Sequence, residues 1–218
     1  MKRFLLASIA VFCFGSLAHA DVACSPTNQP INGSGSISSY TCGALVFSQF
    51  VVLNGDGGSL PQVFLLGGSV ASDGTVVLSF DPQLGPTGNT TDIDLFFTVT
   101  GGVNMVDLSV NGTNASISEK VCSSAMNETP GSLTFGICQG TTLANISAQS
   151  DTPNQPIFSN QFATTSPIFI FKDINIGAQG SLSSFNQSFH EVPEPASMVL
   201  FGTGLISLAG ALRRKLRK

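Results

Sequence analysis

The sequence predicts an all-β protein: an antiparallel β-sandwich or jelly-roll-like domain between an N-terminal signal helix and a C-terminal transmembrane helix. Three observations predict it. Apolar residues between the two ends come in short runs rich in β-branched and aromatic side chains. Gly, Asn and Asp turn residues separate these runs, and no stretch between the ends keeps a 3.6-residue period. Closely spaced strands with turn chemistry between them are typical of β-sandwiches.

The N-terminus has the layout of a secretory signal. A positively charged start precedes an uncharged stretch over residues 4–17, and the small residues Ala18 and Ala20 stand at positions −3 and −1 of a cleavage site. The apolar stretch is shorter than the roughly 20 residues that span a bilayer. We expect residues 1–20 to engage the secretion translocon and to be removed by signal peptidase; an uncleaved anchor is the alternative.

Four cysteines remain after the signal: Cys24, Cys42, Cys122 and Cys138. An even number in an exported domain favours disulfides over metal ligation. Three pairings are possible. We favour Cys24–Cys42 and Cys122–Cys138, because each closes a short local loop. Four free buried thiols are the alternative.

The domain is expected to span residues 21–176. Expected strands cover residues 44–53, 62–66, 75–80, 93–100, 104–110, 115–121, 133–138, 142–147 and 167–176. Asn111-Gly112 is a typical hairpin turn between two of them. Proline and glycine mark residues 81–92 and 151–156 as surface loops. The polar, Ser-rich residues 177–191 are expected to form a tether to the tail.

Charge is distributed unevenly along the chain. Of nine Lys and Arg residues only Lys120 and Lys172 lie between the two ends, against thirteen Asp and Glu residues, so this segment carries a net charge of −11. Phosphate backbones repel such a domain, which excludes nucleic acid as a partner.

The sequence contains no complete catalytic motif. His190 is the one histidine after the signal, and we expect it to be an exposed tether residue, so no Ser-His-Asp arrangement has a base. Asp92, Asp94 and Glu119 are candidates for a carboxylate site, but exposed acidic residues are the more ordinary interpretation. The oxygen-rich residues 54–59 resemble a calcium loop, yet a plain turn is favoured. We therefore expect no enzyme, no cofactor and no metal site.

The C-terminal segment 192–218 has three parts in a fixed order. Pro193-Glu194-Pro195 is followed by an uncharged run over residues 196–212. A basic cluster then ends the chain: Arg213, Arg214, Lys215, Arg217 and Lys218. As a helix the run reaches about 26 Å, short of a hydrocarbon core of about 30 Å. The basic cluster at 213–218 places the end of the chain in the cytoplasm and the domain outside.

This tail resembles the PEP-CTERM sorting signal of Gram-negative bacteria, which is also called an ice-binding-protein C-terminal domain without implying ice binding. The resemblance covers residues 192–218. It implies recognition at Pro193-Glu194-Pro195 by exosortase, a membrane enzyme associated with exopolysaccharide export. The helix would be removed or exchanged, and the domain would pass from an inner-membrane-anchored intermediate to the cell surface or matrix.

The expected function is therefore that of a surface or matrix component, structural in a biofilm or exopolysaccharide. A carbohydrate-binding module or adhesin is one alternative, although aromatic platforms for sugars are scarce in a chain with no Trp and only Tyr40. A hydrolase built on Asp92, Asp94 or Glu119 is the other alternative.

Overall fold

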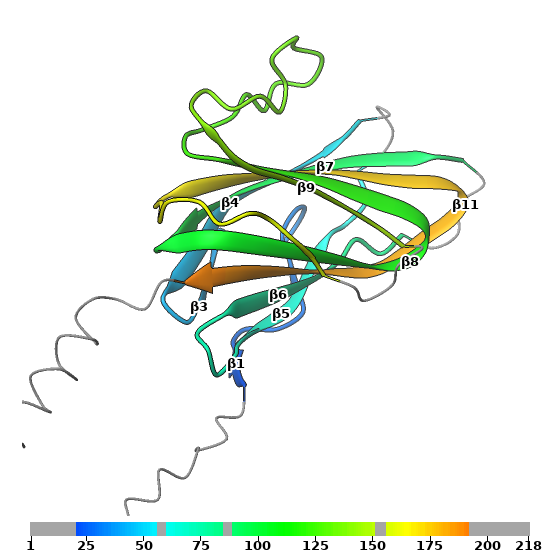
Figure 1. Cartoon of the computed structure of the whole chain (residues 1–218). Helices are drawn as coiled ribbons and strands as arrows, with labels where there is room; N and C mark the ends of the chain where they lie inside the picture. The colour runs from blue at the N-terminus through cyan, green and yellow to red at the C-terminus, as the bar shows by residue number, and fades with distance from the viewer. Residues whose placement is uncertain (1–20, 56–59, 85–88, 151–155, 192–218) are drawn as a thin grey trace, which may run out of the picture.

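The structure, a computed structural model, describes residues 21–55, 60–84, 89–150 and 156–191 (Figure 1). All of their regular elements are β-strands, which confirms the predicted all-β class. The strands are β1 (Val22–Cys24), β2 (Gln29–Pro30), β3 (Ser39–Cys42), β4 (Leu45–Asn54), β5 (Phe64–Val70), β6 (Val76–Asp81), β7 (Thr91–Thr100), β8 (Val103–Cys122), β9 (Thr142–Gln149), β10 (Ile157–Phe158) and β11 (Ile168–Glu191).

Every strand pairing is antiparallel, and two long strands belong to both layers of the fold. The first half of β11 lies between β7 and the second half of β8. Its second half lies between β6 and the first half of β8. Layer A therefore runs β3-β4-β7-β11-β8-β9, and layer B runs β1-β5-β6-β11-β8-β10. In Figure 1, β7 and β9 lie above β5 and β6, while β8 and β11 curve from one layer into the other.

Glycines permit the bend that lets β8 and β11 change layer. The pairing register shifts between Ile176 and Ser181. A Cβ at Gly112 would lie 2.2 Å from the Ser181 carbonyl oxygen, and one at Gly177 would lie 2.2 Å from the Asn114 side chain. Backbones can approach this closely only where no side chain intervenes.

Phenylalanines from both layers meet in the interior. The Phe47 ring of layer A lies 5.1 Å from the Phe189 ring of layer B, and the Phe97 ring lies 6.0 Å from that of Phe80. Phe80 also stacks on Phe185 at 4.9 Å. All five side chains are buried. Burial of these rings, together with the Val, Leu and Ile side chains of the same core, stabilises the packing of the two layers.

The two disulfides are those that the local-loop argument favours. Cys24–Cys42 links β1 to β3, and Cys122–Cys138 closes the segment 123–141 that follows β8. Loops of about 15 residues contribute roughly 3 kcal/mol each in the chain-entropy model. The disulfides therefore fasten the first strands and the segment after β8.

Two of the expected strand boundaries are wrong. Residues 104–110 and 115–121 belong to the single strand β8, and Asn111-Gly112 makes no turn, because the glycine serves the close approach to β11. Residues 133–138 form turns, in which the amides of Phe135 and Ile137 donate to Ser132 and Thr134.

The expected tether is also wrong, because residues 177–191 form the second half of β11. Phe185 and Phe189 anchor them in the interior, and five residues pair with β6. The expected signal helix and the transmembrane helix 196–212 lie outside the described residues. Among the described residues, no helix has the length and apolar character to cross a bilayer.

Candidate functional site

The outer face of layer A carries the candidate site. Side chains alternate along β11, so that Lys172 points into the interior while Phe171 and Asp173 point outward. Cross-strand pairing places Ser147, Ser118, Asp173 and Asp94 in one row across four strands. The register thus assembles one polar row from residues that are distant in sequence.

A small aromatic cluster lies beside this row. Phe96 stacks on Phe171 at 4.7 Å, and the Phe135 ring meets Phe171 edge-on at 5.8 Å. Phe135 belongs to the segment 123–141, which the Lys120 ammonium also holds by donating to the Gly136 carbonyl at 2.8 Å. This disulfide-closed segment therefore covers one end of the outer face.

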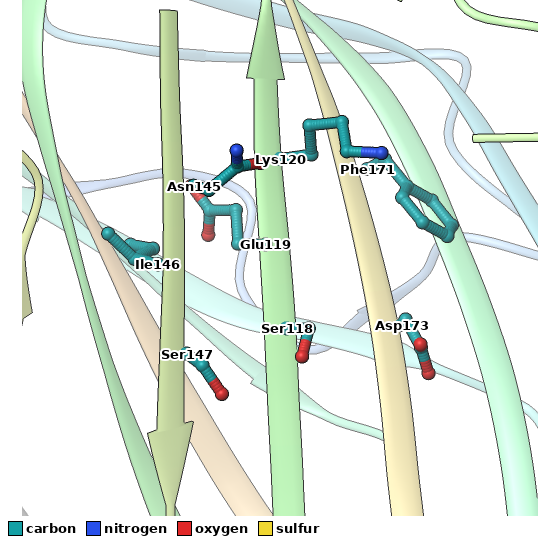
Figure 2. Close-up of a pocket in the computed structure, with 8 residues that line it drawn as sticks. All are labelled: Ser118, Glu119, Lys120, Asn145, Ile146, Ser147, Phe171 and Asp173. Carbon is teal, nitrogen blue, oxygen red and sulfur yellow. The ribbon is translucent and has the colours of Figure 1, made fainter. Parts of the chain in front are cut away.

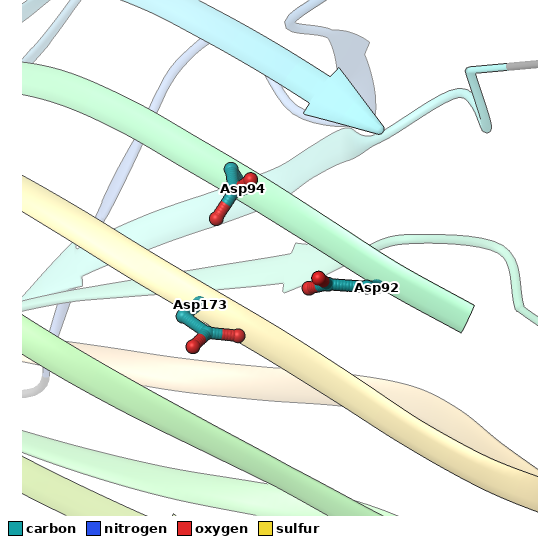
Figure 3. Close-up of side chains that lie close together, drawn as sticks. All are labelled: Asp92, Asp94 and Asp173. Atoms are coloured by element: carbon teal, nitrogen blue, oxygen red, sulfur yellow. The ribbon is translucent and has the colours of Figure 1, made fainter. Parts of the chain in front are cut away.

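Three carboxylates gather where β7 and β11 run side by side (Figure 3). Asp94 pairs directly with Asp173, and Asp92 is two residues before Asp94 on the same face. One oxygen of each carboxylate lies within 4.8 Å of the others. The i, i+2 spacing predicts that Asp92 and Asp94 share a face; Asp173 joins them only through the β7–β11 register.

Asp94 is the most buried of the three, with 6% of its surface exposed. Burial, together with the negative charges of Asp92 and then Asp173, raises the pKa of its carboxyl to about 7. The electrostatic influences on Asp94 all disfavour its ionised form. The cluster therefore holds a proton at Asp94 near neutral pH or requires a positive charge beside it.

Two shallow hollows meet on this face. The one over the carboxylates has a volume of about 390 Å³ and is bordered by Leu53 and Phe135. The other has a volume of about 370 Å³ and lies over β8, β9 and β11 (Figure 2). Phe171 and Asp173 line both. The two hollows thus form one groove on this face, mainly polar over the carboxylates and mainly apolar over β8, β9 and β11, with Phe171 where they meet.

The groove side chains suit two kinds of ligand. Figure 2 shows Asn145 and Ser147 on β9 beside Ser118 on β8, with Lys120 reaching toward Phe171. Hydroxyl and amide groups beside a ring match the hydroxyls and the apolar faces of sugars. At the other end, carboxylate oxygens are the donors that calcium takes, although calcium needs six to eight of them.

The oxygen-rich loop considered for calcium borders the same groove. Its first residues, Asn54 and Gly55, line the hollow over the carboxylates, and residues 56–59 lie outside the described part of the chain. The Gly55 amide donates to the Asp92 carbonyl at 3.0 Å. This end of β4 thus positions Asp92.

His190 is not an exposed tether residue, because it lies in β11 on the outer face of layer B. Its Nε2 lies 2.9 Å from Asp107 Oδ2, and its Nδ1 lies 3.1 Å from the Thr75 hydroxyl. Hydrogen bonds from the Thr75 amide and then from its hydroxyl lower the pKa of Asp73. Thr75 is buried directly before β6, and its hydroxyl also contacts Asp73. The hydrogen bonds of His190 therefore connect β11 to Asp107 on β8 and to the start of β6.

Glu119 is not an exposed acid either. It points into the interior of the sandwich, where Lys172 Nζ donates to its Oε2 and the Gln187 amide donates to its Oε1 at 3.1 Å. Strand alternation sends the side chain of the adjacent Lys120 to the opposite face. Glu119 therefore takes no part in the groove's chemistry with Asp92 and Asp94.

The remaining predicted site residues lie outside the described part of the chain. These are Ala18 and Ala20, Pro193-Glu194-Pro195, and the basic cluster at 213–218.

Comparison with known proteins identifies the tail. Residues 191–215 match the family model of the PEP-CTERM protein-sorting motif, which confirms the resemblance. The chain therefore carries the tail of an exported protein that is processed at the membrane. The match begins at the last residue of β11, so the sorting motif follows the folded domain without a separate tether. No curated protein matches the chain with significance.

Solved structures resemble the domain only distantly. TmCBM61, solved with beta-1,4-galactotriose, is 16% identical with a TM-score of 0.35, and the match covers 64% of this chain and 88% of that one. A family two carbohydrate esterase from Cellvibrio japonicus is 12% identical with a TM-score of 0.26, over 67% and 36% of the two chains. The tailspike protein 4 of bacteriophage CBA120 is 10% identical with a TM-score of 0.29, over 65% and 18%. Similarities at this level carry no information on ligand or activity.

Proposed function

We propose that this protein is a non-enzymatic component of the cell surface or extracellular matrix of a Gram-negative bacterium, sorted by exosortase through Pro193-Glu194-Pro195. The observation that carries the proposal is the match of residues 191–215 to the PEP-CTERM motif. Export through the translocon brings the domain to an oxidising compartment, where disulfides form. The acidic charge of the domain aids its solubility there.

A non-enzymatic role is supported by how the candidate acid and base groups are engaged. Glu119 is fully buried against Lys172. His190 is held between Thr75 and Asp107. A catalytic group needs access to a substrate. Asp92 and Asp94 line the hollow over the carboxylates, whereas both carboxylate oxygens of Glu119, which borders the other hollow, accept hydrogen bonds in the interior.

A second candidate function is carbohydrate binding, and the groove on layer A favours it. The chain has no Trp and one Tyr, but Phe171 supplies an aromatic surface in the groove. Asn145 and Ser147 are exposed and line the same hollow. Exopolysaccharide is the natural ligand class for a matrix protein with such a groove. Binding would hold the domain in the matrix after sorting.

The sorting proposal is tested by replacing Pro193, Glu194 and Pro195 with alanine in the full chain. Mass and location are compared in cells with and without exosortase. We expect the wild-type chain to lose its tail only in cells with exosortase, and the variant to keep it. A matched control, Ser197→Ala with Thr203→Ala, leaves the motif intact and should be processed. A wild-type chain that keeps its complete tail in its host would make the tail a plain anchor.

The carbohydrate proposal is tested by binding of the purified protein to the host exopolysaccharide and to a glycan array. Asn145→Ala with Ser147→Ala should weaken binding at least several-fold, because both side chains line the groove. Ser109→Ala on the outer face of layer B is the matched control. Equal loss in both variants, or no binding by the wild type, would count against the groove.

A further inference from the structure

A polar trio lies in the interior of the sandwich, between its two layers. Lys172 Nζ donates hydrogen bonds to Glu119 Oε2 and to Gln187 Oε1. The Gln187 amide donates to Glu119 Oε1 at 3.1 Å, which closes the triangle. The side chains of Lys172 and Glu119 and the whole of Gln187 are 0% exposed. An amine, a carboxamide and a carboxylic group are therefore in mutual contact without solvent access.

The surroundings of the trio are apolar. Lys172 pairs with Leu95, and Gln187 pairs with Leu108. The Phe185 ring lies 5.4 Å from Lys172 Nζ. An aromatic and aliphatic enclosure of this kind keeps water out and strengthens every polar interaction within it.

This enclosure favours the uncharged forms of the two ionisable groups. Burial lowers the pKa of Lys172, against the opposing effect of Glu119, and burial raises the pKa of Glu119, against the opposing effect of Lys172. A neutral amine is a nucleophile, and a protonated carboxyl group is a general acid. The geometry thus brings a nucleophile, an acyl group and a proton carrier together.

We propose that Lys172 and Gln187 form an intramolecular isopeptide bond, with Glu119 carrying the protons. Lys172 Nζ attacks Gln187 Cδ and forms the new C–N bond. Glu119 donates its proton to the carboxamide and receives one from Nζ. The Cδ–Nε2 bond then breaks, and Nε2 leaves as ammonia. The net change converts a primary amide and an amine into a secondary amide and ammonia, so no oxidant or other reactant is needed.

Pre-organisation makes such a slow acyl transfer feasible within one folded chain. Amines exchange with amides very slowly in water, but fixed contact between reacting groups contributes a large effective concentration. Glu119 contacts both the nitrogen that enters and the nitrogen that leaves. The same group therefore serves attack and departure.

The bond would join the two layers covalently. Lys172 lies in the half of β11 that belongs to layer A, and Gln187 lies in the half that belongs to layer B. The two disulfides lie elsewhere, at the first strands and at the segment after β8. A third cross-link at the centre of the sandwich would protect a matrix protein from force and from proteolysis. The inference does not depend on sorting or on sugar binding.

Mass spectrometry of the full chain, exported, purified, reduced and alkylated, tests the proposal. Between Lys120 and Arg213 the only trypsin site is Lys172. We expect a wild-type peptide that starts at Val121, runs uncut through Lys172 and is lighter than its sequence by one ammonia. Fragment ions should localise the loss to a closed loop between residues 172 and 187.

Variants separate the roles of the three groups. Gln187→Met and Lys172→Met remove a reacting group, and Glu119→Gln removes the proton carrier while keeping the shape; each should abolish the mass loss. Lys120→Arg, on the outer face, should retain it. If the wild-type peptide has its full mass, the trio is a hydrogen-bonded ion pair and the proposal is overturned. Loss of one water would overturn the assignment of Gln187, because it indicates a bond to Glu119. The wild-type result is decisive even where a variant fails to fold.

Discussion

Lys172 and Asp173 are neighbours in the chain and lie in opposite environments. Lys172 points into the sandwich, where it meets Glu119 and Gln187, and Asp173 points outward beside Asp94. Inside, an amine and a carboxyl group stabilise each other by hydrogen bonds, whereas outside three carboxyl groups gather over two strands. One strand therefore supports two polar clusters that differ in the sign of their interactions.

Burial and neighbouring groups combine differently in setting the pKa values of the two clusters. For Glu119 and Lys172 burial is the largest influence on the pKa of both groups, and their mutual attraction opposes it. For Asp94 burial and its neighbours act in the same direction. Removing one member of the interior trio should therefore destabilise the fold, whereas removing one carboxylate of the outer cluster should stabilise it or leave it unchanged.

The largest effect is expected from breaking the interior trio. Glu119→Leu removes the buried hydrogen-bond partner that Lys172 and Gln187 share and should lower the free energy of unfolding by about 3–5 kcal/mol. The double variant Glu119→Leu with Lys172→Met replaces both polar groups by apolar ones and should recover part of that loss. Urea unfolding measures both. A single variant as stable as the wild type would contradict the importance of the pair.

The second-largest effect is expected from removing the disulfide Cys122–Cys138, which closes the segment over the outer face of layer A. Cys122→Ala with Cys138→Ala should cost about 3 kcal/mol in the free energy of unfolding, because the loop regains conformational freedom in the unfolded chain. It should also loosen the cover over Phe171 and Asp94, so that the pKa of Asp94 falls toward its ordinary range. Thermal unfolding and NMR titration check the two effects. Cys24→Ala with Cys42→Ala, at the first strands, is the matched control and should leave the pKa of Asp94 unchanged.

The sequence predicts the outer cluster better than the interior trio, for physical reasons. Alternation along one strand places Asp92 and Asp94 together, but their meeting with Asp173 depends on the register between β7 and β11. The polar, Ser-rich composition of residues 177–191 makes the second half of β11 resemble a tether, and Gln187 adds to it. A polar residue at an inward position, together with the register shift between Leu182 and Ser184, removes the two-residue apolar period.

The continuation of β8 from one layer into the other was equally hard to predict from the sequence. Asn111-Gly112 has the chemistry of a hairpin turn, and only the proximity of Ser181 shows why the glycine is needed within β8. Local patterns identify strands and turns. They do not contain the long-range pairing that bends two strands across both layers.

A moderate effect is expected from pH through Asp94. Between about pH 4 and pH 7 the folded chain holds a proton on Asp94 that the unfolded chain releases, since the pKa of Asp94 is about 7 in the folded chain and its ordinary value is 3.8. Stability is therefore highest at the acidic end and falls as the pH rises through this window. Asp94→Asn should remove this dependence and stabilise the protein at pH 8 by about 2 kcal/mol, given partial screening by solvent in the groove.

Urea unfolding from pH 5 to pH 8 in the presence of a chelator measures the effect of Asp94→Asn. Asp21→Asn, at an exposed position before β1, is a control for general loss of charge. A wild-type stability that rises with pH through the window would contradict the raised pKa of Asp94. Repeating the series with calcium in place of the chelator separates protonation from cation binding, because a bound cation would keep Asp94 ionised and flatten the pH dependence.

The smallest effect is expected at Asp173, and it tests whether the three carboxylates act together. Asp173 is half-exposed and accepts a hydrogen bond from the Asn175 amide, so Asp173→Asn should change stability by only about 0.5 kcal/mol. Its influence on Asp94 should be clearer, because removing one like charge lowers the pKa of Asp94. A double-mutant cycle of Asp94→Asn and Asp173→Asn at pH 8 measures the coupling. Additive effects would mean that Asp173 does not contribute to the raised pKa of Asp94, which burial and Asp92 would then control, and the contrast between the two faces of β11 would not depend on repulsion between the paired residues Asp94 and Asp173.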